Sequence, residues 1–184
     1  MHELFKYIVT AILTFEAKIL LRRKRPKIIG ITGSVGKTTT KDAIFTVLKN
    51  EVHVRKSEKS FNSNIGVTLT ILGLQNGWNS PWLWLRNIVD GAFQALFATD
   101  YPDVLILELG VDRPGDMKTL TKFIKPDIVV LTRLPDMPSH VEFFSSPEEV
   151  REEKLTLVKS LKVDGVFIYN NDDEKIRKEL ENVR

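Results

Sequence analysis

Short apolar runs alternate with longer stretches of helical periodicity along most of this chain. Runs of this kind are typical of buried parallel strands, and helices form between them where apolar residues recur every three or four positions. The predicted strands span 27–32, 51–55, 103–109, 127–132 and 165–169. The predicted helices span 37–49, 65–74, 82–98, 115–124, 147–161 and 173–184. This alternation predicts an α/β fold with an open, mostly parallel sheet, helices on both faces and right-handed crossovers.

The predicted helix at 82–98 has its apolar residues at 82, 85, 89, 92, 93 and 96, which is helical spacing. We expect its Trp82 and Trp84 to cover the sheet. Contact with a partner protein or a membrane is the alternative for these two side chains.

The N-terminal stretch from Leu4 to Leu21 is apolar but is interrupted by Lys6, Glu16 and Lys18. A membrane-spanning helix needs about 20 mostly apolar residues, so the stretch fits that role poorly. We expect a basic amphipathic helix over 1–25 that packs on a domain formed by 26–184. Two alternatives stay open: an interfacial helix making peripheral membrane contact, with Arg22–Arg25 meeting anionic lipid, and a spanning segment.

Composition narrows the class of protein. The chain has 184 residues, 42% hydrophobic and 28% charged, which is ordinary for one soluble globular domain. It has no cysteine, which excludes disulfides, Cys-ligated zinc and a Cys nucleophile and fits a cytoplasmic protein. Residues 1–30 hold seven Lys and Arg against two Glu, whereas the rest holds 20 basic and 22 acidic residues. The positive charge is therefore N-terminal, and no nucleic-acid partner is expected.

A phosphate-binding loop is predicted between the first strand and the helix after it, at Thr32-Gly33-Ser34-Val35-Gly36-Lys37-Thr38-Thr39. Glycines let backbone N–H groups turn toward an anion, and the helix N-terminus favours negative charge. Lys37 would reach the β and γ phosphates of ATP, and the Thr38 hydroxyl would bind Mg²⁺. Ile31 stands where the general pattern has glycine. The alternative is a tight glycine turn with an exposed lysine.

Other candidate residues follow the later strands. Glu108 ends a buried strand at its carboxyl edge, where ligands bind in open α/β sheets, so we expect it to hold Mg²⁺. His140 follows a strand that enters the same edge, which makes it a candidate ligand for a second metal ion. A satisfied surface glutamate and an ordinary loop histidine are the alternatives.

The loop has the form T-G-[ST]-x-G-K-[ST]-[ST] and resembles that of the Mur ligase family, ATP-dependent amide-bond synthetases of peptidoglycan assembly. Further segments resemble the family in the same order, over roughly Pro26 to Asp173. They are Phe61–Val67, Leu107–Gly110 with Gly115-Asp116, Pro126-Asp127, His140, and Phe144–Ser146 with Glu148 and Lys154. The segment 61–67 looks like the N-x-N-x-I-G-V of the ligase that adds D-alanyl-D-alanine, and it argues against a folylpolyglutamate-type ligase.

The resemblance implies a P-loop NTPase-like central domain. Lys37, Glu108, His140 and Lys154 would be catalytic, and Thr38, Glu108, His140 and Lys154 would bind metal. The matching lysine of the family is often carbamylated, although K-G-E is here Lys154-Leu155-Thr156, and Arg133 replaces a common asparagine. Asn62 and Asn64 would line the acceptor side.

The implied reaction joins two substrates. The γ-phosphate of ATP passes to a carboxylate of a UDP-linked muramoyl tripeptide, and D-alanyl-D-alanine then attacks the acyl phosphate to form an amide. The family's uridine-nucleotide domain, its H-N-x-x-N segment and its C-terminal domain have no counterpart in the sequence. We therefore expect a fragment or a shortened relative, whose C-terminal domain another chain could supply. A nucleotide-dependent scaffold or switch, docking on a membrane or a partner, is the alternative.

Overall fold

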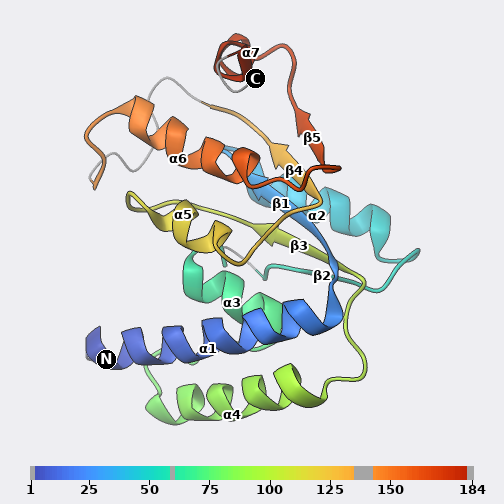
Figure 1. Ribbon diagram of the computed structural model, residues 1–184, viewed down its shortest axis with the longest axis vertical. Helices are drawn as coiled ribbons and strands as arrows, with labels where there is room; N and C mark the ends of the chain where they lie inside the picture. Colours follow the sequence, from blue (N-terminus) through green and yellow to red (C-terminus); the bar gives the residue numbers. More distant parts are fainter. Residues whose placement is uncertain (1–2, 59–60, 135–142, 182–184) are drawn as a thin grey trace.

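A computed structural model describes residues 3–58, 61–134 and 143–181 and contains a five-stranded sheet in the order β2-β3-β1-β4-β5 (Figure 1). All strand pairs described are parallel. The strands are β1 Lys27–Thr32, β2 Val54–Lys56, β3 Val104–Glu108, β4 Ile128–Leu131 and β5 Val166–Tyr169. The helices are α1 Glu3–Lys24, α2 Lys37–Leu48, α3 Asn64–Leu72, α4 Pro81–Phe97, α5 Asp116–Thr121, α6 Pro147–Lys159 and α7 Glu174–Glu181.

The strand register brings the ends of three strands together. β1 lies between β3 and β4, with Ile31 opposite Glu108 and Thr32 opposite Leu131. In a parallel sheet all carboxyl ends meet at one edge. The loop after β1, the end of β3 and the loop after β4 therefore border one site.

Helices cover both faces of the sheet, which confirms the predicted architecture. On one face, Ile31, Ile106 and their neighbours pack against the apolar side of α2. On the other face, Leu105, Leu107 and Val129 pack toward α3 and α6. Nearly the whole of α3 is buried, because it lies between the sheet and the N-terminal helix (Figure 1).

The helices α1 and α4 form a further layer outside α3. Val9, Leu13, Ala17 and Leu20 of α1 are buried and join the same hydrophobic core as α3 and the sheet. At the end of α1, the Arg23 guanidinium donates to the carbonyls of Ala95 and Ala98, which lie at the α4 C-terminus, where helix carbonyls lack an intrahelical partner. Among the described helices, none is long and apolar enough to cross a membrane.

Two local expectations were wrong. Trp82 is 73% exposed, and α4 packs on α1 and α3 rather than on the sheet, whereas Trp84 is buried with its indole N–H donating to the Trp78 carbonyl at 3.0 Å. The strand expected over 51–55 is Val54–Lys56. The N–H groups of Glu51 and Val52 instead donate to the Leu48 carbonyl, so the chain turns there before it extends.

Candidate functional site

The predicted phosphate-binding loop joins β1 to α2 and has the backbone geometry that its glycines allow. Gly33 has φ 137° and Gly36 has φ 84°, and Gly36 is the N-cap of α2. L side chains rarely adopt such positive φ values. Thr32 is buried at the end of β1, whereas Val35 and Thr39 are exposed around the turn. The loop therefore opens directly at the N-terminus of α2, where the helix dipole favours an anion.

The end of β4 fixes the loop from the side. A Cβ on Gly33 would lie 2.1 Å from the Thr132 hydroxyl, so a side chain larger than hydrogen cannot fit without movement. The Thr132 hydroxyl donates to the Val35 carbonyl at 2.7 Å, and the Ser34 N–H donates to the Arg133 carbonyl at 3.0 Å. The Lys37 ammonium donates to the Gly33 carbonyl at 2.9 Å and so lies folded over the loop.

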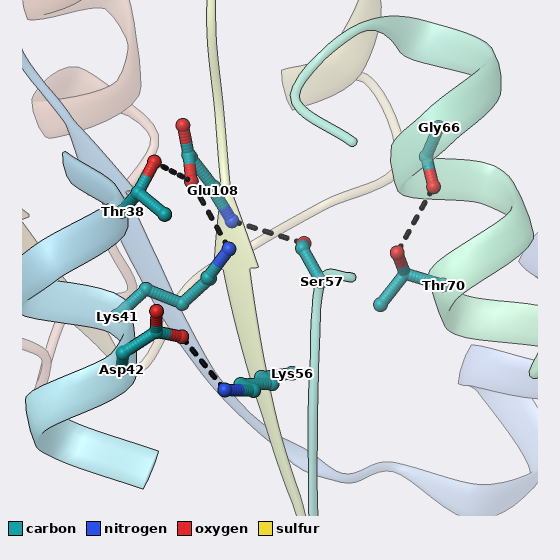
Figure 2. Close-up of polar contacts among 8 residues, drawn as sticks. All are labelled: Thr38, Lys41, Asp42, Lys56, Ser57, Gly66, Thr70 and Glu108. Carbon is teal, nitrogen blue, oxygen red and sulfur yellow. Dashed lines mark hydrogen bonds and ion pairs between the residues drawn. The ribbon is translucent and has the colours of Figure 1, made fainter. Parts of the chain in front are cut away.

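Glu108 lies at the carboxyl end of β3 and is only 2% exposed. Its Oε2 accepts a hydrogen bond from the Thr38 hydroxyl at 2.9 Å and forms an ion pair with the Lys41 ammonium at 3.3 Å (Figure 2). The structure thus brings together Thr38 and Glu108, which the sequence placed at the same sheet edge. A surface role for Glu108 is excluded by its burial.

Lys41 is a residue of the site that the sequence analysis missed. It is 1% exposed and is the largest fully buried side chain described, although an isolated lysine on a helix is usually solvated. Its position one turn after Lys37 puts it on the same side of α2. That spacing, together with a glutamate ending a buried strand, is the signal that could have identified it.

Ser57 also joins the site without having been predicted. The Glu108 backbone N–H donates to its hydroxyl at 3.2 Å, and Ser57 itself is fully buried just beyond β2 (Figure 2). Next to it, the Lys56 ammonium pairs with Asp42 of α2 at 2.7 Å. These contacts hold α2 and the end of β2 against β3, and they orient the backbone of Glu108.

Lys154 reaches the loop from α6. Its ammonium donates to the Ser34 hydroxyl at 2.7 Å, and the residue is only 6% exposed. Burial, together with the nearby charge of Lys37, lowers the pKa of Lys154 to about 8. A buried lysine of this kind has a substantial neutral fraction near neutral pH, which an exposed lysine lacks.

Of the two predicted acceptor residues, Asn64 lines a cavity of about 550 Å³, together with Gly110 and Arg113, whereas Asn62 is not in its lining. The Asn64 Oδ1 is buried and has no hydrogen-bond partner in the described part of the chain. Asn62 packs against Gly110, whose N–H donates to the Asn62 carbonyl at 2.9 Å. Lys6 of α1 also lines this cavity, a contribution that the sequence did not indicate.

Oxygen atoms suitable for Mg²⁺ meet beside the loop. A hydroxyl and a carboxylate, from Thr38 and Glu108, lie 2.9 Å apart. Within the described ranges no group of three or more His, Cys, Asp and Glu is arranged to hold a metal ion. Two protein oxygens are nevertheless enough for a Mg²⁺ site, because Mg²⁺ usually keeps several water ligands and takes further oxygen ligands from the substrate phosphates. His140 lies within residues 135–142, which are outside the described residues.

Fold and loop together define an α/β protein of the P-loop type. A family model, the Mur ligase middle domain, matches residues 31–81 and 87–184. The chain therefore belongs to the Mur ligase family, and the part of the family that it matches is the middle domain.

Several relatives are ligases of one kind. The UDP-N-acetylmuramoyl-tripeptide--D-alanyl-D-alanine ligase of Bacillus subtilis is 32% identical over 157 residues, covering 85% of this chain and 29% of the relative. The ligase of the same name from Mycobacterium leprae is 34% identical over 149 residues, covering 81% and 24%. This chain thus spans less than a third of the length of these relatives.

Solved structures agree with this assignment. MurF ligase from Thermotoga maritima, in complex with ADP, superposes with a TM-score of 0.69 at 27% identity, over 95% of this chain and 34% of the other. MurF from Acinetobacter baumannii superposes with a TM-score of 0.68 at 19% identity, over 95% and 33%, which supports the fold alone.

Proposed function

We propose that this chain is the ATP-binding central domain of an amide-bond ligase that activates a substrate carboxylate as an acyl phosphate. The observation that carries the proposal is the cradle formed by residues 32–39 with Thr38, Glu108 and Lys154 around it. The ADP complex of the Thermotoga maritima relative supports ATP as the nucleotide. Residues 26–184 would form this domain, in the cytoplasm, with α1 as its N-terminal addition.

Each residue of the cradle has a distinct task in phosphoryl transfer. The N–H groups of the loop and of the first turn of α2 hold the phosphates, and the Lys37 ammonium leaves the Gly33 carbonyl to neutralise the transferred group. Thr38 and Glu108 would hold Mg²⁺, which neutralises charge on the phosphates when it is bound. Lys41 holds the Glu108 carboxylate in place through their ion pair. Positioning and charge neutralisation supply most of the rate in such reactions.

Lys154 is proposed to react with carbon dioxide and to carry a carbamate, as the resemblance implies. The neutral amine of Lys154, which is accessible because its pKa is lowered to about 8, attacks the carbon of carbon dioxide. An N–C bond forms, one C=O π bond becomes a carboxylate C–O⁻, and one amine proton is released to solvent. The product is an anion beside Ser34, which would replace repulsion of Lys37 by attraction. His140 is proposed as a further metal ligand.

The acceptor is proposed to bind in the cavity bordered by Asn64 and Gly110. By relation to the Bacillus subtilis ligase, the acceptor would be a UDP-linked muramoyl tripeptide and the amine D-alanyl-D-alanine. Lys6 and Arg113 would pair with anionic groups of the acceptor, although Asp112 and Asp116 of the same lining balance their charge, and the unpartnered Asn64 oxygen suits an N–H of a peptide. Thus α1 would complete the acceptor side of the site.

A second candidate is a nucleotide-binding scaffold without ligase activity, docking on a membrane or a partner. The observation that favours it is the exposed apolar surface of α1 and α4. For the ligase, by contrast, a further domain, from the same polypeptide or another chain, would bring in the amine.

Trapping with hydroxylamine separates the two candidates. The chain is incubated with ATP, Mg²⁺ and the UDP-linked tripeptide, without the amine, and the hydroxamate made from the acyl phosphate is measured. The ligase domain predicts a hydroxamate that is absent for Lys37→Ala and retained for Lys49→Ala, an exposed lysine at the far end of α2. Nucleotide binding without any hydroxamate would contradict the ligase and favour the scaffold.

A further inference from the structure

The side of α1 that faces away from the domain is apolar along its first four turns. Leu4, Tyr7 and Phe15 are 70%, 74% and 64% exposed. The polar residues Thr10 and Thr14 are instead half-buried, and the Thr14 hydroxyl lies 3.5 Å from that of Thr68 on α3. A surface helix usually has the opposite arrangement, with its polar side outward.

The neighbouring helix α4 has a second exposed apolar side. Its members recur at helical spacing and are each at least half exposed: Trp82, Leu85, Val89, Phe93, Leu96 and Phe97. The two helices pack on each other, and α4 lies on the side of α1 that is remote from α3 (Figure 1). With lengths of about 33 and 25 Å at 1.5 Å per residue, they present far more apolar surface than isolated exposed side chains do.

The outward row of α1 becomes basic where the helix approaches β1. Leu4, Ile8, Phe15 and Arg22 follow one another at intervals of four or seven residues, so they lie along one line of the helix. Beside Arg22 is a cavity of about 380 Å³ with six basic side chains in its lining: Lys18, Arg22, Arg25, Lys122, Lys125 and Lys162. None of the lining residues described is acidic, although Asp127 accepts from Lys162 at 2.9 Å just outside it.

We propose that α1 and α4 form a membrane-docking surface for a bilayer that carries anionic headgroups, with the basic cavity receiving a headgroup phosphate. Aromatic and aliphatic side chains beside a group of Lys and Arg are the composition of helices that lie in the bilayer interface. The charge of the cavity complements anionic lipid. Arg23 and Lys24 bind carbonyls at the end of α4 and just after it, whereas Arg22, Arg25 and Lys125 line the cavity that would receive the headgroup.

Vesicle flotation tests this surface with the intact chain. We expect the chain to float with mixed phosphatidylcholine and phosphatidylglycerol vesicles and not with phosphatidylcholine alone. The double variant Arg22→Glu/Lys125→Glu should reduce the bound fraction more than tenfold, because each basic residue near a surface contributes about fivefold to partitioning. The matched control Lys49→Glu/Lys178→Glu has the same net charge but changes α2 and α7, so its binding should change by less than about twofold.

Fluorescence quenching places α4 in the same surface. Trp82 is exposed and should be quenched by brominated lipid, whereas Trp82→Phe keeps the apolar side and should bind equally with much less quenching. An absence of flotation, or an equal loss for the control pair, would overturn the proposal and indicate that protein covers this face. Because no residue of the phosphate-binding loop is changed, ATP binding by the variants separates this outcome from failure of the nucleotide site.

Discussion

At the scale of single residues, the buried pair of Lys41 and Glu108 is the strongest constraint on the site. Both side chains are almost fully buried, at 1% and 2% exposure, and their charged atoms lie 3.3 Å apart. Burial of two charges is costly unless they are paired and hydrogen-bonded. The pair therefore ties the start of α2 to the end of β3, where Thr38 also contacts Glu108.

Removal of one partner should destabilise the protein. Lys41→Met leaves the Glu108 carboxylate buried without this cation, and we expect the free energy of unfolding to fall by about 3–5 kcal/mol. Urea denaturation measures this change. The double variant Lys41→Met/Glu108→Gln should recover at least half of the loss, and Lys49→Met should change stability by less than about 0.5 kcal/mol. A single variant as stable as the native chain would mean that the pair has no structural role.

The pKa of Lys154 gives a pH dependence that is specific to one residue. Burial lowers this pKa in the folded state to about 8, so the neutral amine increases as pH rises through that value. With ¹³C-labelled bicarbonate, a carbamate signal should therefore grow between pH 7 and 9 and vanish in Lys154→Met. The same signal in Lys154→Met, or its absence in the native chain throughout this range, would contradict carbamate formation on Lys154.

The sequence analysis identified those site residues whose role follows from the residues adjacent to them in the chain. The loop at 32–39 is local, and Glu108 ends a run that could only be a buried strand. Lys41 could not be predicted in this way, because its partner lies 67 residues away and only the fold brings them together. Lys6 was missed for the same reason, since it reaches the acceptor cavity from a helix that precedes the segments resembling the family.

At the scale of elements, the periodicity of apolar residues predicted where the helices are, but not which side of each helix is buried. The helix α4 has apolar residues on both sides, so a helical period could not indicate which side is buried. The sequence suggested that Trp82 and Trp84 share one environment, but Trp84 is buried and Trp82 is exposed. The packing of α1 between α3 and α4 decides which side is covered.

The contact between α1 and α4 contains a buried acid. Glu16 is 6% exposed, and its Oε2 has no hydrogen-bond partner among the described residues. It lies against Gly91, where a Cβ would come within 2.2 Å of the carboxylate. Burial raises the pKa of Glu16 to about 7. The ionised form therefore weakens the packing of α1 on α4 at higher pH.

Glu16→Gln should remove this pH dependence. The folded-state pKa of Glu16 is raised above the ordinary glutamate value of 4.5, so the stability associated with protonated Glu16 is present below that ordinary value and is lost as pH rises to about 7. The variant should thus melt roughly 2–4 °C above the native chain at pH 8, equivalent to about 1 kcal/mol, and close to it at pH 5. Melting curves at both pH values measure this. Glu51→Gln, at an exposed turn, should show no such difference, and an equal effect of Glu16→Gln at both pH values would contradict the burial argument.

At the scale of the whole molecule, the two edges of the sheet have different chemistry. The carboxyl edge joins the phosphate-binding loop, Glu108 and Lys154, with the acceptor cavity beside them. The amino edge bears the basic cavity where α1 ends. The alternation of strands and helices in the sequence predicted this parallel sheet. The packing of α1 and α4 outside α3 was not predicted, because it depends on contacts between segments that are distant in the chain.

The central claim is that the loop at 32–39 binds ATP together with Mg²⁺, and calorimetric titration tests it most directly. The chain is titrated with ATP in the presence and absence of Mg²⁺, beside Lys37→Ala and the control Lys49→Ala. We predict binding that requires Mg²⁺, that is retained in the control and that weakens at least tenfold, or about 1.4 kcal/mol, in Lys37→Ala. No binding by the native chain, or equal affinity in Lys37→Ala, would contradict the assignment of this loop as the nucleotide site.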